Sequence, residues 1–434
     1  MASVKIDPVT APIRASIRPP GSKSITNRAI VCAALAAGRS VLSGVLDSED
    51  TTVMIEAWQQ LGLHVEHNKA DHTLVIDGGG GKTPVMDAEL FVANSGTTIR
   101  FLTAALAACE GRFRLDGVER MRERPIADLL AALGQLGAQV ESLNAQHPNC
   151  PPVLLNARGL AGGRATVAGN ISSQFLSGLM MAAPMARADV ELQVEGELVS
   201  VPYVAMTAEV MRAFGAEIHG NEQGPFTISA AKKYRGAQYA IEPDASAASY
   251  FWAAGALTGG AATVEGLSRR SLQGDVRFCE CLAQMGCKVE YGSDSITVQG
   301  GKLKGIDVDM SDISDTVQTL AAVAMFAEGP TTVHGVAHNR VKETDRISDL
   351  ATELRKLGAV VDEFPDGLAI HPPREVIPCE IETYRDHRMA MSLALVSLRC
   401  SGLTILDPGC TAKTYPHYWE DLALFAGCRV RRFD

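Results

Sequence analysis

The sequence predicts an α/β protein of two domains, each made of three repeated α/β units. Three observations predict this class. The chain has 434 residues, 46% of them hydrophobic and 21% charged, so it can bury a large core and is too long for one ordinary domain. A short helix-to-strand phrase recurs six times along the chain. A polar cluster followed by an alanine-rich helix recurs in phase with that phrase.

Each copy of the phrase has the character of a helix end, a glycine and a strand start. The copies stand about 70 to 78 residues apart, which is longer than a solenoid repeat, so each belongs to a small α/β subdomain. Unrelated α/β segments also share this pattern, but six copies in register are poorly explained by chance. The copies are residues 60–65, 135–140, 213–218, 284–289, 356–361 and, more weakly, 425–430.

The alanine-rich segments are apolar on most sides, which is typical of buried helices. Each unit therefore offers a buried helix that begins at a polar cluster, then strands, and a second, amphipathic helix that ends in the recurring phrase. The expected buried helices are residues 24–37, 96–109, 173–183, 245–257, 315–327 and 386–400.

Composition excludes several function classes. The net charge is −10 and no basic run is interleaved with aromatic residues, so we expect no nucleic-acid partner. No segment reaches the roughly 18 apolar residues of a membrane span, and no signal core follows the start, so we expect a cytoplasmic protein without membrane contact. Among ten cysteines the only close group, Cys279, Cys281 and Cys287, lacks zinc-site spacing, so we expect reduced thiols and no metal.

Basic residues stand where helices usually carry acids. The first turn of a helix has a partial positive charge and free N–H groups, so it favours Asp and Glu. One arginine at a helix start is usually a solvated surface residue. Recurrence at several helix starts instead favours a shared ligand with several negative charges. The basic residues are Lys23, Arg28, Arg100, Arg124, Lys342, Arg346, Arg388 and Lys413.

Neutral donors and two acids accompany these bases. Serines at helix starts are ordinarily N-caps, and that interpretation stays open beside ligand binding. A glycine at position 96 lets a ligand approach the backbone closely. Asp315 and Glu343 could exchange protons with a substrate held in a basic, partly dry site, although simple ion pairing explains them equally well. The serines are Ser22, Ser24, Ser172, Ser173 and Ser200.

Read together, these clusters resemble the enolpyruvyl transferase family, and most closely its shikimate-pathway branch, the 5-enolpyruvylshikimate-3-phosphate synthases. The order and spacing of the matching segments are specific, and the segments span nearly the whole chain. They are residues 20–28, 94–97, 123–126, 172–175, 244–246, 340–346, 386–390 and 407–416.

The resemblance implies an inverse α/β barrel fold of two domains with three α/β units each. One domain would be residues 22–242, and the other would combine residues 1–21 with 243–434. The active site would lie in the cleft between them, and the domains would close on binding. The family needs no cofactor or metal, its substrates are small molecules, and we expect a monomer.

The resemblance also implies the reaction and its residues. The enolpyruvyl group of phosphoenolpyruvate would move to the 5-hydroxyl of shikimate 3-phosphate through a tetrahedral intermediate, with release of phosphate. Asp315 would be the base, Glu343 the acid toward C3, and Lys23 would assist. Shikimate 3-phosphate would contact Lys23, Ser24, Arg28, Ser172, Ser173, Gln174, Ser200, Tyr203, Asp315, Lys342 and, as an open possibility, His338. Phosphoenolpyruvate would contact Lys23, Gly96, Arg124, Gln174, Arg346, Arg388 and Lys413.

Two positions depart from the family pattern. His338 stands where many members have Asn beside the substrate, so either substrate contact or a plain loop position remains open for it. Phe101 stands where some members have Pro, a position tied in the family to the inhibitor glyphosate, so the sequence does not predict sensitivity to it.

The nearest alternative is the sister transferase that acts on UDP-N-acetylglucosamine. Its members typically start with a Lys-Asn pair and carry a reactive cysteine in a loop near the position of Arg124. Here Ser24 follows Lys23, and residues 119–123 contain no cysteine, which disfavours this alternative.

Two further alternatives come from other classes. A kinase would need the G-x-x-x-x-G-K-[ST] loop, but Ser22 separates Gly21 from Lys23. A non-catalytic repeat scaffold would leave Asp315 and Glu343 without a purpose.

Overall fold

The computed structural model describes residues 2–221 and 223–433. Its internal contacts divide the chain into two compact units. The contiguous unit is Gly21–Ile241. The split unit combines Met1–Pro20 with Glu242–Asp434, of which residues 1 and 434 lie outside the described part. The chain therefore passes from the split unit into the contiguous unit and back again.

One topology recurs throughout the chain. The described strands form six four-stranded sheets. Across each sheet, one edge strand is parallel to its neighbour, and the remaining two pairs of neighbouring strands are antiparallel. Along most of the chain the order is strand, buried helix, parallel strand, second helix and antiparallel hairpin. This repetition confirms the predicted fold class.

The contiguous unit contains three of these repeats. The first has β14 (Gln238–Ala240), α1 (Lys23–Leu35), β3 (Ala37–Ser43), α2 (Glu49–Gln60), β4 (His64–Asn68) and β5 (Thr73–Gly79). The second has β6 (Asp87–Phe91), α3 (Gly96–Ala107), β7 (Glu110–Asp116), α4 (Ala127–Gln135), β8 (Val140–Ser142) and β9 (Val153–Arg158). The third has β10 (Gly163–Ala168), α5 (Ser173–Ala182), β11 (Val190–Glu195), α6 (Val201–Ala213), β12 (Ile218–His219) and β13 (Phe226–Ile228).

The split unit repeats the pattern and uses the start of the chain twice. Its first repeat has β2 (Arg14–Ile17), α7 (Ala245–Thr258), β15 (Ala261–Glu265), α8 (Phe278–Gln284), β16 (Lys288–Tyr291) and β17 (Ser295–Gln299). The second has β18 (Asp307–Asp309), α9 (Val317–Ala324), β19 (Thr331–His334), α10 (Arg346–Lys356), β20 (Val360–Phe364) and β21 (Gly367–His371). The third has β22 (Glu380–Ile381), α11 (His387–Ala394), β23 (Thr404–Leu406), α12 (Tyr418–Ala426), β24 (Val430–Phe433) and β1 (Ser3–Ile6).

The recurring glycines lie where the phrase predicted them. Each follows the second helix of its repeat and precedes a strand, with a positive φ between 61° and 106°. This backbone region is strained for residues with a Cβ, so glycine is the residue that ends these helices at low cost. The glycines are Gly62, Gly137, Gly215, Gly286, Gly358 and Gly427.

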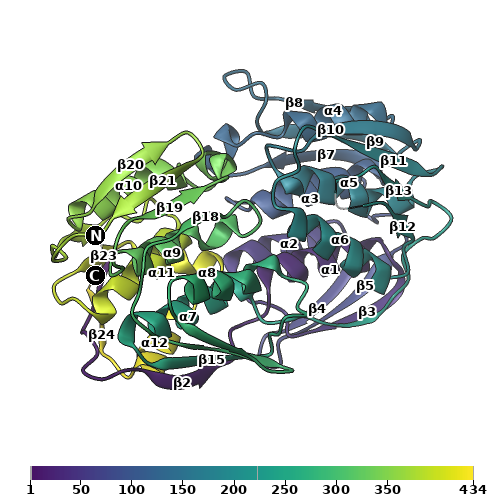
Figure 1. Ribbon diagram of the computed structural model, residues 1–434. Helices are drawn as coiled ribbons and strands as arrows, with labels where there is room; N and C mark the ends of the chain where they lie inside the picture. Colours follow the sequence, from purple (N-terminus) through teal and green to yellow (C-terminus); the bar gives the residue numbers. More distant parts are fainter. Residues whose placement is uncertain (1, 222, 434) are drawn as a thin grey trace. The chain divides into compact units, whose positions relative to one another are not determined.

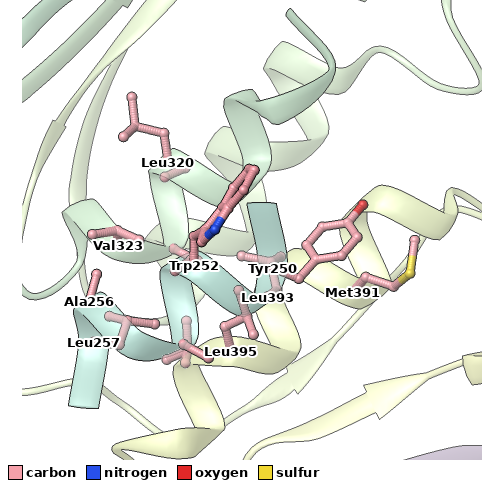
Figure 2. Packing of buried hydrophobic residues seen from close by; sticks show 14 of the residues in the cluster. Tyr250, Trp252, Ala256, Leu257, Leu320, Val323, Met391, Leu393 and Leu395 are labelled. Carbon is pink, nitrogen blue, oxygen red and sulfur yellow. The ribbon is translucent and has the colours of Figure 1, made fainter. Parts of the chain in front are cut away.

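The buried helices form the centre of each unit. Helices α1, α3 and α5 contact one another in the contiguous unit, and α9 contacts both α7 and α11 in the split unit (Figure 1). Figure 2 shows part of the split unit's core, where Trp252 of α7, Leu320 of α9 and Leu393 of α11 are fully buried. Among the described residues, no helix is both long and apolar enough to cross a membrane.

Two of the predicted helices are shorter than expected. The helix expected over 315–327 begins as the 3-10 turn η4 (Ser314–Thr316) before α9 starts at Val317. The helix expected over 386–400 changes after α11 into the 3-10 turn η6 (Leu395–Leu398). In both cases the tighter turn is next to the end of a short helix, which is where 3-10 geometry is common.

Candidate active site

The buried helices of the contiguous unit begin at the same end. Asn27 Nδ2 near the start of α1 donates to Thr97 Oγ1 in the first turn of α3, at 3.2 Å. Arg100 Nη1 of α3 donates to Gln174 Oε1 in the first turn of α5, at 2.7 Å. Helices α3 and α5 each connect two parallel strands, and these hydrogen bonds join the starts of all three helices, so their N-termini and free N–H groups collect at one end of the unit. That end attracts anions.

The serines at these helix starts act as caps, as the conservative interpretation of the sequence holds. Ser22, Ser95 and Ser172 accept from backbone N–H groups of Ile25, Thr98 and Gln174 at 3.3–3.4 Å. Ser200 differs, because it precedes α6 in the left-handed region with φ of 56°. A non-glycine residue in that region is strained, and such strain is found most often at functional sites.

Arg28 is the most deeply buried of the predicted basic residues in this unit, with 1% of its surface exposed. Its guanidinium donates to Thr207 Oγ1 at 2.7 Å and to Ser177 Oγ and the Tyr203 carbonyl at 3.3 Å. It also lies 5.1 Å from the ring centre of Phe101. Burial lowers the pKa of Arg28 to about 10, so it remains charged at neutral pH.

Lys23 lies in the first turn of α1, beside an acid. Its Nζ is 3.5 Å from Asp50 Oδ2, and the Asp50 side chain is almost fully buried. The backbone carbonyl of the next residue, Ser24, accepts from Arg28 Nη1 at 2.9 Å. The start of α1 thus holds a lysine and an arginine in defined positions, as the sequence predicted.

Gly96 lies under a guanidinium. A Cβ built on Gly96 would stand 2.5 Å from Arg124 Nη2 and 2.8 Å from Arg100 Nη1, so a larger residue would displace both. Arg124 is anchored by a hydrogen bond from Nη1 to the Asn94 carbonyl at 3.0 Å. The glycine therefore permits Arg124 to cross the first turn of α3 next to the helix N–H groups.

Arg100 has a role that the sequence did not indicate. We expected a basic residue facing an anion, but its guanidinium bonds to other parts of the site. Besides Gln174, it donates from Nη2 to the Pro125 carbonyl at 2.9 Å and lies 5.2 Å from the Phe175 ring centre. Arg100 therefore ties the first turn of α5 to the backbone beside Arg124.

In the split unit the buried helices also begin at one end. Three buried hydroxyls, one from each helix, form a chain: Ser249 of α7, Thr319 of α9 and Ser392 of α11, with 3.1 Å between neighbouring oxygens. The chain crosses the N-terminal halves of α7 and α9, so these two helices start on the same side. Arg388 in the first turn of α11 donates to Asp315, two residues before α9, so α11 also starts there.

Six predicted residues of the split unit come together at this end. Asp315 in η4 accepts from Arg388 Nη2 at 2.6 Å and from Arg346 Nη1 at 3.1 Å, and Lys342 Nζ is 3.5 Å away. Glu343 accepts from Arg346 Nη2 at 2.9 Å. Lys413 Nζ, at the end of η7 (Pro408–Lys413), is 3.8 Å from Glu343.

Arg346 is the link between the two predicted acids. It is 2% exposed and also pairs with the fully buried Asp386, from Nε to Oδ2 at 2.6 Å. Although burial alone would lower the pKa of Arg346, Asp386, Glu343 and Asp315 raise it above its ordinary value. A permanently charged Arg346 is therefore held by three carboxylates, and it fixes the spacing of Asp315 and Glu343.

Lys342 has the opposite balance. Burial lowers its pKa below the ordinary value, and Asp315 opposes that shift. A lysine with a lowered pKa in a polar cluster is a feature of functional sites more often than of structural ion pairs.

His338, whose role the sequence left open, is buried within η5 (Ala337–Val341). Its Nε2 lies 2.8 Å from Ser314 Oγ, directly before Asp315. Burial, followed by the charge of Lys342, lowers the pKa of His338 to about 3, so the ring is neutral at physiological pH. His338 thus belongs to the split-unit cluster as a neutral side chain.

Sequence reasoning assigned no role to Asp386, and it expected Arg100 to serve a ligand rather than to join parts of the site. Asp386 caps α11, accepting from Arg388 N at 2.9 Å, and at the same time pairs with Arg346. The available signal was an acid that directly precedes a helix otherwise starting with His387 and Arg388.

Each unit thus presents an end rich in helix N-termini, cations and, in the split unit, two semi-buried carboxylates. Such an end can bind phosphate and carboxylate groups and exchange protons with what it binds. Among the residues described, no group of three or more His, Cys, Asp or Glu side chains could hold a metal ion. Fold and site together define an anion-binding α/β protein equipped for acid–base chemistry.

Comparison with known proteins gives the particular family. The family model described as EPSP synthase (3-phosphoshikimate 1-carboxyvinyltransferase) matches residues 9–422. A 3-phosphoshikimate 1-carboxyvinyltransferase of Nostoc punctiforme is 47% identical over 420 residues, covering 96% of this chain and 98% of the relative. One from Vibrio vulnificus is 44% identical over 425 residues, covering 98% and 99%. The EPSP synthase structure from Acinetobacter baumannii superimposes with a TM-score of 0.83 at 27% identity over the whole of both chains. The chain belongs to the EPSP synthase family.

Proposed function

We propose that this protein transfers the enolpyruvyl group of phosphoenolpyruvate to the 5-hydroxyl of shikimate 3-phosphate and releases inorganic phosphate. Membership of the EPSP synthase family supports this reaction. The structural observation that supports it best is the network in which Arg346 joins the carboxylates of Asp315 and Glu343 amid three further cations. Such a network suits a reaction that needs one base, one acid and several bound negative charges.

The chemistry requires these groups. Phosphoenolpyruvate is an electron-rich enol whose C2 becomes electrophilic when C3 is protonated. In the proposed addition step, Asp315 takes the proton of the 5-hydroxyl of shikimate 3-phosphate, and the hydroxyl oxygen forms a bond to C2 of phosphoenolpyruvate. At the same time Glu343 gives a proton to C3 of phosphoenolpyruvate. The tetrahedral intermediate then loses a proton from C3 while the C2–O bond to phosphate breaks. Lys23 could assist either proton transfer, and the cations stabilise the departing phosphate.

The proposed ligands come from both compact units. Shikimate 3-phosphate would contact Lys23, Ser24, Arg28, Ser172, Ser173, Gln174, Ser200, Tyr203, Asp315, His338 and Lys342. Phosphoenolpyruvate would contact Lys23, Gly96, Arg124, Gln174, Arg346, Arg388 and Lys413. We therefore propose that the units act as two domains with the active site in the cleft between them. Small-angle scattering with and without both substrates tests this, since closure lowers the radius of gyration and separate sites would leave it unchanged.

We further propose that the protein is a cytoplasmic monomer that needs neither metal nor cofactor and binds neither nucleic acid nor membrane. Its site offers cations and helix N-termini for the substrate anions, so protein groups can supply the electrostatic stabilisation. Activity that survives dialysis against EDTA would support the metal-independent part. A sedimentation mass near twice 46.1 kDa would contradict the monomer.

The deciding experiment follows phosphate release from phosphoenolpyruvate with either shikimate 3-phosphate or UDP-N-acetylglucosamine as acceptor. We expect release with shikimate 3-phosphate and none with the sugar nucleotide. Removal of the base in Asp315→Ala, or of the acid in Glu343→Gln, should lower kcat about 100- to 10,000-fold, the usual contribution of acid–base catalysis. Release only with the sugar nucleotide would assign the protein to the sister activity, and release with neither acceptor would refute the proposed reaction.

A further inference from the structure

A buried carboxylate outside the proposed ligand set lies against the start of α7. Asp275 in η3 (Gly274–Arg277) is 2% exposed, and its Oδ2 accepts a hydrogen bond from Ser246 Oγ in the first turn of α7. Gln273 clamps this segment to the same helix start: its Oε1 accepts from Ala245 N at 2.9 Å, and its Nε2 donates to the Pro243 carbonyl at 2.7 Å. The Asp275 carboxylate is therefore fixed in place rather than free to reach solvent.

The segment that carries Asp315, the proposed base, also lies against α7. Both η3 and η4, which carries Asp315, contact α7. The groups that act electrostatically on Asp275 are Asp244 at the start of α7, Asp315 of η4 and Arg388 of α11. Other charged residues close in sequence point elsewhere: Arg277 pairs with Asp312 at 2.8 Å, and Glu280 of α8 is exposed.

Keeping this carboxylate buried is costly. Burial, followed by the repulsion of Asp315, raises the pKa of Asp275 to about 6, while Ser246 and Arg388 oppose the rise. At neutral pH the side chain therefore carries a charge that the fold would be more stable without. Such a cost is more common at a functional site than in a structural core.

We propose that Asp275, held by Ser246, is a positioning residue for the enolpyruvyl transfer and acts on substrate only through Asp315 and Arg388. The inference rests on the proposed function. Three cations surround Asp315 and favour its ionised form, which weakens it as a base. The negative charge of Asp275 opposes this effect of the three cations and also acts electrostatically on Arg388. Asp315 therefore attracts the proton of the 5-hydroxyl more strongly than it would without Asp275.

The proposal predicts a pH dependence with a definite sign. Above pH 6 Asp275 is ionised and supports Asp315, whereas below pH 6 Asp275 is neutral and the support is lost. The kcat of the wild-type protein should therefore fall on the acid side near pH 6. A variant that is neutral at every pH should resemble the low-pH wild type throughout.

Asp275→Asn tests this, since Asn can still accept the hydrogen bond of Ser246. We expect kcat at pH 7.5 to fall about tenfold, corresponding to one unit of proton affinity, and the slope of kcat between pH 5.5 and 7.5 to flatten. Thermal unfolding should occur at the same or a higher temperature at pH 7.5, because the variant buries no charge. Lower activity combined with equal or greater stability is a result that a purely structural role cannot give.

Ser246→Ala and Ser249→Ala form a matched pair on α7. Ser246→Ala removes the hydrogen bond that favours ionised Asp275, so the acid-side fall of kcat should move to higher pH. Ser249→Ala breaks the buried hydroxyl chain, and should lower stability while leaving the pH profile of kcat in place.

The outcomes separate this inference from the function on which it rests. A wild-type protein that releases no phosphate would refute the proposed function. An active wild type whose kcat and pH profile are shared by Asp275→Asn would refute the positioning role alone. If Asp275→Asn does not fold, a pH profile of Ser246→Ala that coincides with that of Ser249→Ala would refute it equally.

Discussion

Replacing Arg100 by Ala should damage the use of phosphoenolpyruvate although Arg100 is not one of its proposed ligands. The guanidinium holds Gln174 Oε1 at 2.7 Å and the Pro125 carbonyl, next to Arg124, at 2.9 Å. Each hydrogen bond from a charged donor contributes roughly 1.5–3 kcal/mol. Losing both frees Gln174 and the backbone beside Arg124, two of the proposed ligand positions.

The expected magnitude follows from the displacement of these groups. A shift of about 1 Å in a positioning group can cost about 100-fold, so we expect kcat/KM for phosphoenolpyruvate to fall about 10- to 100-fold. This corresponds to about 1.4–2.8 kcal/mol of transition-state stabilisation. Binding of shikimate 3-phosphate, for which Gln174 is one proposed ligand among eleven, should weaken less, because Arg28 is held separately by Thr207 and Ser177.

The assay is steady-state phosphate release with each substrate varied in turn. Arg100→Lys should remain defective, since one ammonium group cannot span both acceptors as the planar guanidinium does. Arg122→Ala is the control: it removes an arginine of the 3-10 helix η1 (Glu119–Glu123), two residues before Arg124, whose side chain is half exposed and pairs with Asp116. If Arg100→Ala folds normally and keeps kcat/KM for phosphoenolpyruvate within twofold of the wild type, the reasoning about this network is wrong.

The remaining predictions concern stability. Gly137→Ala should lower the free energy of unfolding by about 1 kcal/mol or more. Gly137 has φ of 89°, and an added Cβ would stand 3.2 Å from the Cβ of Ala161. Gly134→Ala, at an open position within α4, should gain about 0.5–1 kcal/mol, and urea unfolding of both variants measures the contrast. The lowered pKa of His338, about 3, means that its contribution to stability is present above pH 6.5 and is lost progressively as the pH falls toward 3. The melting temperature of His338→Gln should therefore decline less between pH 6.5 and 5 than that of the wild type, and parallel declines would contradict the assignment of a neutral buried ring.

The repeats were predictable because their signal is local. A glycine such as Gly358 ends a helix through its own φ of 96°, and the residues beside it show the change from helix to strand directly. The cluster of Lys342, Glu343 and Arg346 was equally accessible, because four of the five residues 342–346 at a helix start are charged and demand an explanation.

Contacts between distant segments were not predictable in this way. Arg100 contacts Gln174, 74 positions further along, and Asp275 contacts Ser246, 29 positions before it. The sequence shows that Arg100 is charged and lies in a helix, but not whether its charge serves a ligand or its neighbours. Asp275 has no periodic or capping signal, since its importance arises from two elements that meet only in the folded chain.

The position of β1 has a consequence for the order in which the chain can fold during synthesis. This strand is at the start of the chain but lies between β23 and β24, pairing with both, and the chain ends meet there (Figure 1). The contiguous unit, Gly21–Ile241, can be complete while the ribosome is still translating the second half. The split unit must wait until residues 430–433 have left the ribosome, so its first twenty residues remain without their sheet partners for most of translation. A nascent chain stalled near residue 400 should thus carry one finished unit and one that proteases still cleave.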